Sequence, residues 1–169
     1  MRIKFLTLLS VAVAVGCSKM SDRGGRDGEG PLRVQLPAGW KLDYQVQKGL
    51  DLYVLNSAEQ GLMMFSPWEE NTHSEDMPSV VRQSAQSVVD GMSDTGALRL
   101  ASKEIKVEAF TGKYFSGQYV SLAGVKGTDK VILAVFMFSD GFTVWGGQFT
   151  GKTNEWPDAL AMLKTLQPP

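Results

Sequence analysis

The chain has 169 residues, 43% of them hydrophobic, and its 17 Lys and Arg nearly balance its 18 Asp and Glu, giving a formal net charge of −1. This length accommodates one domain with a proper core, and the lack of a basic cluster in the sequence argues against nucleic acid as a partner. A single cysteine and a single histidine exclude an internal disulfide and leave few ligands for a zinc site.

The first 16 residues predict a secretory signal peptide. Arg2 and Lys4 precede an apolar run, residues 5–15, that only Thr7 and Ser10 interrupt. A helix that spans a membrane needs roughly 20 apolar residues, so this run is too short to be one. We therefore expect residues 1–16 to direct export and to be removed from the mature protein.

The end of this run resembles a bacterial lipobox. The sequence Ala14-Val15-Gly16-Cys17 closes on the only cysteine, although leucine is more usual than alanine at the first of these positions. The resemblance implies fatty acylation of Cys17, and several acyl chains together give stable anchoring. Ser18 stands where aspartate would signal retention in the inner membrane, so we expect the outer membrane, facing the periplasm. The alternative is an ordinary signal peptide with a chance cysteine.

Residues 17–31 predict a flexible tether after the lipidated Cys17. They are rich in Gly, Ser and charges of both signs, with Met20 as the only large apolar residue, and such a segment buries too little surface to offset its ordering entropy. Residues 32–169 then form a single domain of the commonest size. The domain is expected to lie close to the membrane and to turn freely on its tether.

The first half of this domain predicts four short strands and a helix. Alternating apolar residues separated by Pro, Gly and Asn turn signals indicate strands at residues 32–36, 40–46, 50–55 and 62–66. Residues 77–92 change to helical spacing, with Asp76 as the predicted N-cap and Pro78 in the first turn. The expected apolar stripe of this helix consists of Met77, Val81, Ala85, Val88, Val89 and Met92.

The second half repeats this order. Strands are predicted at residues 98–110, 113–122, 130–138 and 142–149. Asp140-Gly141 indicates a hairpin with a type I′ turn, and the apolar run at 131–138 indicates a central strand that is covered on both faces. A last helix opens at Thr153 and packs Trp156, Leu160, Leu163 and Leu166 on one side. Strands followed by helices, twice over, predict an α+β fold in which helices flank an antiparallel sheet.

Three stretches of this domain are similar to the PsbP-like family, whose members are α/β/α sandwiches and include bacterial lipoproteins. They are VQLPAGW at the start, FSDGFTVWGGQFTG near the end, and WPDALAMLKTL in the last helix. The similarity covers nearly all of residues 32–169. It implies the sandwich fold and a protein that binds or assembles other proteins, and it implies no catalytic residue.

Residues 146–153, GGQFTGKT, match the spacing of a phosphate-binding P-loop. A genuine P-loop follows the first core strand, whereas only 16 residues follow this one. Trp156 and Pro157 would also lie in the helix turn whose N–H groups must face phosphates. We therefore do not expect nucleotide binding, and we interpret Gly146 and Gly147 as a bulge or a close-packed part of a strand, with Thr153 as the helix cap.

The loop at residues 67–78 is the one place that suggests a metal. Its oxygen and nitrogen ligands are Glu69, Glu70, His73, Glu75 and Asp76. Their spacing matches no calcium loop, and one histidine among scattered carboxylates makes a poor zinc site. A solvated acidic loop before a helix explains these residues better. We predict neither a bound metal nor another cofactor.

The sequence contains no nucleophile elbow, and any serine or threonine that needs a histidine base must use His73. We therefore do not expect an enzyme. The aromatic and methionine residues are expected to pack a core, with an apolar ligand pocket or a contact face as the alternative. They are Met63, Met64, Phe65, Trp68, Phe136, Met137, Phe138, Phe142 and Trp145.

These features together predict a membrane-anchored periplasmic lipoprotein whose domain binds or assembles an envelope protein without catalysis. Two alternatives remain open at this stage. One is a carrier of a small apolar ligand, and the other is an immunity protein that neutralises a toxin.

Overall fold

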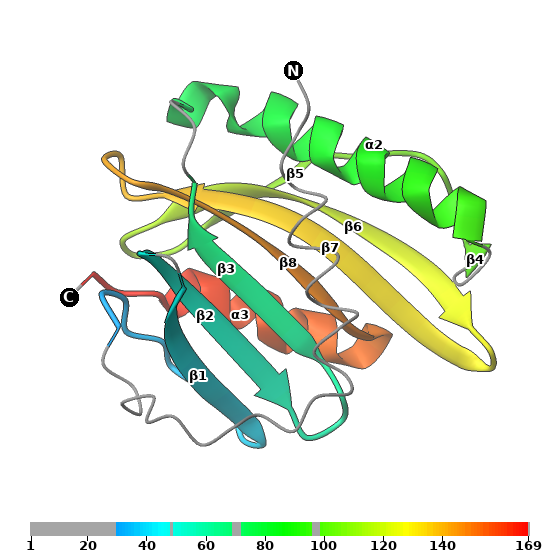
Figure 1. Ribbon diagram of the computed structural model, residues 1–169, viewed down its shortest axis with the longest axis horizontal. Coiled ribbons are helices and arrows are strands. Elements are labelled where there is room, and N and C mark those ends of the chain that lie inside the picture. The colour runs from blue at the N-terminus through cyan, green and yellow to red at the C-terminus, as the bar shows by residue number, and fades with distance from the viewer. Residues whose placement is uncertain (1–29, 48, 69–71, 96–98, 169) are drawn as a thin grey trace.

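A computed structural model describes residues 30–47, 49–68, 72–95 and 99–168, the side chains of 92–95 excepted. These residues form one antiparallel sheet with the strand order β1-β2-β3-β8-β7-β6-β4, in which β5 also pairs with β6 (Figure 1). The strands are β1 Trp40–Gln47, β2 Leu50–Ser57, β3 Leu62–Pro67, β4 Arg99–Leu100, β5 Glu108–Thr111, β6 Ser116–Lys126, β7 Asp129–Ser139 and β8 Val144–Lys152. The α+β prediction is confirmed at this level.

Two α-helices cover opposite faces of the sheet (Figure 1). Helix α2, Met77–Thr95, follows the short 3-10 helix η1, Ser74–Asp76, and packs on β6 and β7. Helix α3, Trp156–Thr165, follows η2, Thr153–Glu155, and packs on the other face. Among the helices of these described residues, none is long and apolar enough to cross a membrane.

The strand predicted to be central occupies that position. Strand β7 lies between β6 and β8, and every residue from Ile132 to Ser139 is buried. Its side chains alternate between the two cores, with Phe136 and Phe138 toward α3 and Val135 and Met137 toward α2. A strand buried on both faces needs this nearly continuous apolar run.

The prediction of a strand at residues 32–36 is wrong. Only Arg33 is bridged, to Gln167 beyond the end of α3, through backbone hydrogen bonds of 3.0 Å in each direction. Tertiary packing explains the difference. Leu32 is buried in the core on the α3 side of the sheet, so this segment packs beside α3 and does not add a strand to the sheet. Only three of the four predicted early strands, now β1 to β3, therefore form the meander.

Predicted strand 98–110 divides into β4 and β5. Both segments pair with β6, Arg99 opposite Val125 and Glu108 opposite Tyr119. Residues 101–107 between them lie outside any strand because Ile105 and Val107 pack toward the core under α2. Tertiary packing thus outweighs the local β-pattern.

The Asp140-Gly141 hairpin forms, but not with the predicted type I′ turn. Ser139 pairs with Val144, so the loop has four residues, and Gly141 has a positive φ of 95° whereas Asp140 does not. A type I′ turn needs positive φ at both central residues. Instead, Asp140 Oδ1 accepts the N–H groups of Phe142 and Thr143, which makes an Asx-type turn.

The predicted cap of the last helix is wrong: Thr153 begins the 3-10 turn η2, and Glu155 is at the N-cap position of α3. Asp76, the predicted cap of the first helix, ends η1 and directly precedes Met77, where α2 begins. In α3 the buried residues are Trp156, Ala159, Met162 and Leu163, and the predicted Leu160 is only partly buried. The predicted stripe of α2 is buried from Met77 to Val89.

Candidate functional site

The GGQFTGKT segment is a strand and not a phosphate loop. Residues 146–152 lie in β8 and pair residue by residue with β7, residues 146–150 also pair with β3 on the other side, and Thr153 begins η2. The backbone N–H groups of a central strand are used in its ladders and do not form a cradle. The motif lysine, Lys152, instead forms a surface ion pair of 3.2 Å with Glu59.

Gly146 and Gly147, the first two glycines of this motif, permit close packing, as the sequence suggested, and the regular register excludes a bulge at them. A Cβ atom on Gly146 would lie 2.6 Å from Cε3 of Trp68. One on Gly147 would lie 2.6 Å from Cβ of Phe65 and would also collide with the carbonyl oxygen of Met64. The glycines are therefore explained by the core of this fold.

The candidate metal residues do not assemble into a site within the described part of the chain. Glu69 and Glu70 lie outside the described residues, and His73, Glu75 and Asp76 are exposed. Among described residues no three acidic, histidine or cysteine side chains are grouped so that they could hold a metal ion. Cys17, the predicted acylation site, also lies outside the described residues, as do the signal segment 1–16 and most of the tether.

A small hollow of about 240 Å³ lies between the start of α2 and the β7–β8 loop. It brings His73 and Glu75 together with Ser139 and Phe142. The Ser139 hydroxyl accepts the N–H of Gly141 and so belongs to the turn. Within the described residues His73 has no hydrogen bond to a serine or threonine hydroxyl, so this hollow does not present an activated nucleophile.

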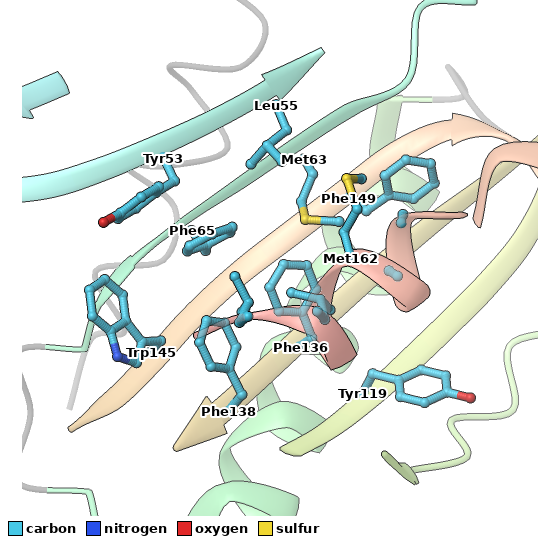
Figure 2. Packing of buried hydrophobic residues seen from close by; sticks show 14 of the residues in the cluster. Tyr53, Leu55, Met63, Phe65, Tyr119, Phe136, Phe138, Trp145, Phe149 and Met162 are labelled. Carbon is cyan, nitrogen blue, oxygen red and sulfur yellow. The ribbon is translucent and has the colours of Figure 1, made fainter. Parts of the chain in front are cut away.

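Most of the predicted aromatic and methionine residues pack against one another. Figure 2 shows Phe65, Phe138 and Trp145 in one group, with ring centroids 5.5–6.3 Å apart. Met63 and Met64 face opposite sides of the sheet and both are buried. Phe142 is the exception, since its side chain is 97% exposed. The core interpretation is correct for this group, and Phe142 requires a separate explanation.

Strand β1 provides a geometry that sequence reasoning missed. It is the edge of the sheet, eight residues long, and no other described strand pairs with its outer side. The carbonyl of Gly39 accepts the N–H of Ala58 at 2.9 Å, and bonded and non-bonded pairs alternate along an antiparallel ladder. Because Gly39 is bonded to Ala58 and Trp40 is opposite Ser57, every second residue from Trp40 onward directs its backbone groups away from β2. The N–H and C=O groups of Leu42, Tyr44 and Val46 therefore lie on the outer side.

A shallow groove of about 700 Å³ lies next to this edge. One wall is the non-strand segment at residues 32–36, and the other is the first half of β1, from Trp40 to Leu42. Its side chains are mostly apolar, with Arg33 and Lys41 as the two cations. Leu36 is 40% exposed. The groove combines an unpaired strand edge with apolar side chains, which is the combination that an extended peptide requires.

Polar contacts fix the far half of β1. The Tyr44 hydroxyl donates to Asp51 on β2, and this bond is the main cause of the raised pKa of Tyr44. Gln45 donates to Asp43 at 2.6 Å on the opposite face of the strand. Charged and polar side chains on an edge strand restrict which partners can pair with it. The sequence showed the alternation of this strand, but nothing in it marked the strand as an edge.

No family model and no curated protein matches this sequence. A solved structure of a protein from Bacteroides thetaiotaomicron is similar, with a TM-score of 0.46 and 10% sequence identity. The match covers 82% of this chain and 45% of that one, so the chain spans less than half the length of that protein.

Proposed function

We propose that this protein is a membrane-anchored periplasmic lipoprotein whose non-catalytic, PsbP-like α/β/α domain binds an extended segment of an envelope protein along the edge of β1. The observation that supports this best is the free eight-residue edge beside an apolar groove. The two-helix, one-sheet layering supports the PsbP-like assignment. The anchor rests on the export signal and on Cys17.

Strand addition accounts for each feature of the edge. An extended segment of the partner would pair with the outward N–H and C=O groups of Leu42, Tyr44 and Val46, which provides affinity. Its alternate side chains would enter the groove beside Leu36 and Leu42, which provides specificity. The partner segment should therefore be extended, with apolar residues at every second position.

The charges at the edge set a further requirement. Lys41 and Arg33 line the groove, so a partner with an acidic residue next to its apolar ones is favoured over a basic one. Asp43 and Gln45 lie farther along the strand on the opposite face from Leu42 and Tyr44. They would interact with the partner side chains that point away from the groove.

The test is a capture experiment on crosslinked cell envelope with two matched variants. Leu36→Asp introduces a charge in the groove, and Val125→Asp introduces the same charge at a residue with the same 40% exposure, on β6. We expect Leu36→Asp to lose the crosslinked partner and Val125→Asp to retain it. Capture that is equal for both variants would contradict binding at this groove.

Two further measurements test the separate parts of the proposal. Hydrogen exchange in the purified complex should slow at the outward amides of Leu42, Tyr44 and Val46, because these would become hydrogen-bonded. Mass spectrometry of the mature N-terminus should find acyl chains on Cys17, and an unmodified thiol there would refute the anchor. Loss of the partner from a Cys17→Ser strain would show that anchoring presents the domain to that partner.

A further inference from the structure

Three turns lie together at one end of the sheet. The register places Gln47 opposite Leu50, Thr111 opposite Ser116, and Ser139 opposite Val144. Because Ser116 also pairs with Ser139, and Pro67 pairs with Trp145, the β1–β2, β5–β6 and β7–β8 turns all belong to the same end. Figure 1 shows them at the left of the view. We call this end the hairpin end.

Three of the five exposed large hydrophobic side chains of the described residues belong to the hairpin end. The two most exposed of all five are Phe142, whose side chain is 97% exposed, and Val46, which is 62% exposed. Both belong to the hairpin end, as does Tyr114 at 42%. Neighbouring strands of a sheet lie about 4.8 Å apart, so the three turns together extend over about 25 Å of the surface. These side chains give the hairpin end apolar contact points distributed across its width.

The two turns that carry Phe142 and Tyr114 are held by backbone hydrogen bonds that do not involve these side chains. The β7–β8 loop is held by Asp140 and Ser139, which accept backbone N–H groups, and Phe142 contributes only its own N–H. In the β5–β6 turn the N–H of Gly112 bonds the carbonyl of Phe115, and Tyr114 extends outward with Lys113 4.9 Å from its ring centre. An aromatic ring beside a lysine suits the headgroup region of a bilayer.

The chain also enters the described domain at this end. Gly30 lies against Tyr53 and Tyr44, near the β1–β2 turn, and the segment then runs toward Trp40 at the opposite end of the sheet. Figure 1 shows the first described residues at the left, on the side of the hairpin end. The 13 residues 17–29 precede them. The tether predicted for this segment would span on the order of 20 Å, so an anchor at Cys17 would hold this end next to the bilayer.

We infer that the hairpin end docks on the lipid surface to which the chain is anchored, with Phe142, Tyr114 and Val46 in the headgroup region. The inference rests on the proposed anchoring at Cys17. Charges of both signs surround the three side chains, including Lys113, Asp140 and Glu75, so apolar contact and not charge drives the docking. Docking orients the sheet with its strands upright on the membrane, which leaves the β1 edge from Trp40 to Tyr44 accessible to a partner.

The test measures docking on vesicles in vitro, so its result does not depend on acylation of Cys17 in the cell. Cys17 is the only cysteine, so the mature chain 17–169 can be coupled through its thiol to phosphatidylcholine vesicles that contain a maleimide lipid. The reference is the same chain with its thiol capped, in solution. The readout is amide hydrogen exchange at residues 140–143, with residues 127–128, in the β6–β7 turn at the opposite end, as the internal control.

We expect coupling to slow exchange at residues 140–143 about fivefold and to leave residues 127–128 unchanged. The double variant Phe142→Ser and Tyr114→Ser should abolish the slowing, whereas Val125→Ser, a matched loss of apolar surface at the opposite end, should not. Exchange in β7 reports whether each variant is folded. No slowing at 140–143, equal slowing at both ends, or slowing that persists in the double variant would overturn the inference. None of these outcomes depends on whether cells acylate Cys17.

Discussion

The hydroxyl of Tyr53 accepts a 2.6 Å hydrogen bond from the backbone N–H of Leu32, which fixes the entry of the chain against the α3 side of the sheet. Tyr53 is fully buried and stacks on Phe65 with ring centroids 4.8 Å apart. Leu32 lies in the same core. The bond therefore determines where the wall of the groove at residues 32–36 begins.

Tyr53→Phe should destabilise the protein by about 1–2 kcal/mol, because the buried N–H of Leu32 loses its acceptor while the ring packing is kept. Urea unfolding followed by tryptophan fluorescence measures this free energy. Tyr44→Phe is the matched control, since its hydroxyl donates to Asp51 in a more exposed place and leaves no backbone group unpaired. An equal loss for both variants would contradict this role for the Leu32 bond.

Stability should fall above about pH 10. Burial raises the pKa of Tyr53, and burial together with the hydrogen bond to Glu108 raises the pKa of Tyr119. A group whose pKa is higher in the folded than in the unfolded state stabilises the fold fully below its unfolded pKa of about 10, and this contribution is lost as the pH rises through the folded pKa.

Unfolding free energies from about pH 8 to pH 11 check this alkaline loss. Tyr53→Phe should make the curve flatter above about pH 10, because it removes the most strongly shifted group. A curve that stays equally steep in the variant would mean that other groups cause the loss.

The elements that the sequence predicted well are those whose local pattern and final environment agree. The run at 131–138 is apolar because β7 is buried on both faces, and the helical spacing from Met77 to Val89 agrees with packing on one face of the sheet. In both cases the pattern is caused by the core itself. Such elements could be predicted without knowing their neighbours.

The features that were missed depend on distant partners. Residues 32–36 alternate like a strand, yet Arg33 bridges Gln167, which is more than 130 positions later in the chain. Similarly, the edge position of β1 and the grouping of Val46, Tyr114 and Phe142 follow from strand order, which alternation does not encode. The candidate site could therefore not be predicted from the sequence, although its strand could.

Glu155 should be one of the most sensitive charged residues of the domain. It is buried, and its carboxylate accepts the hydroxyl of Ser57 and the N–H groups of Gly61 at 3.1 Å and Lys152 at 2.8 Å. It thus connects the β2–β3 turn to the start of η2. Glu155→Ala should cost about 2–4 kcal/mol because it leaves buried donors unpaired, and thermal or urea unfolding measures this cost.

Glu59→Ala provides the comparison for this carboxylate. Glu59 is 55% exposed and pairs only with Lys152 on the surface, so its loss should cost less than about 1 kcal/mol. Glu155→Gln should lie between the two, since its amide oxygen still accepts one hydrogen bond. A Glu155→Ala variant as stable as Glu59→Ala would show that Ser57, Gly61 and Lys152 find other acceptors.

Gly147→Ala tests the packing explanation of the GGQFTGKT segment. A Cβ at this position would lie 2.6 Å from both Phe65 and Phe136, inside the α3-side core, so it should destabilise the fold by about 1–3 kcal/mol or prevent folding. The matched substitution is Gly91→Ala in α2, where a Cβ meets nothing within 4 Å and alanine favours the helix by about 0.5–1 kcal/mol. Denaturant midpoints of the two variants should therefore move in opposite directions. If Gly147→Ala unfolds at the same midpoint as the parent, the core is not close-packed at β8, and the glycines of this segment need another explanation.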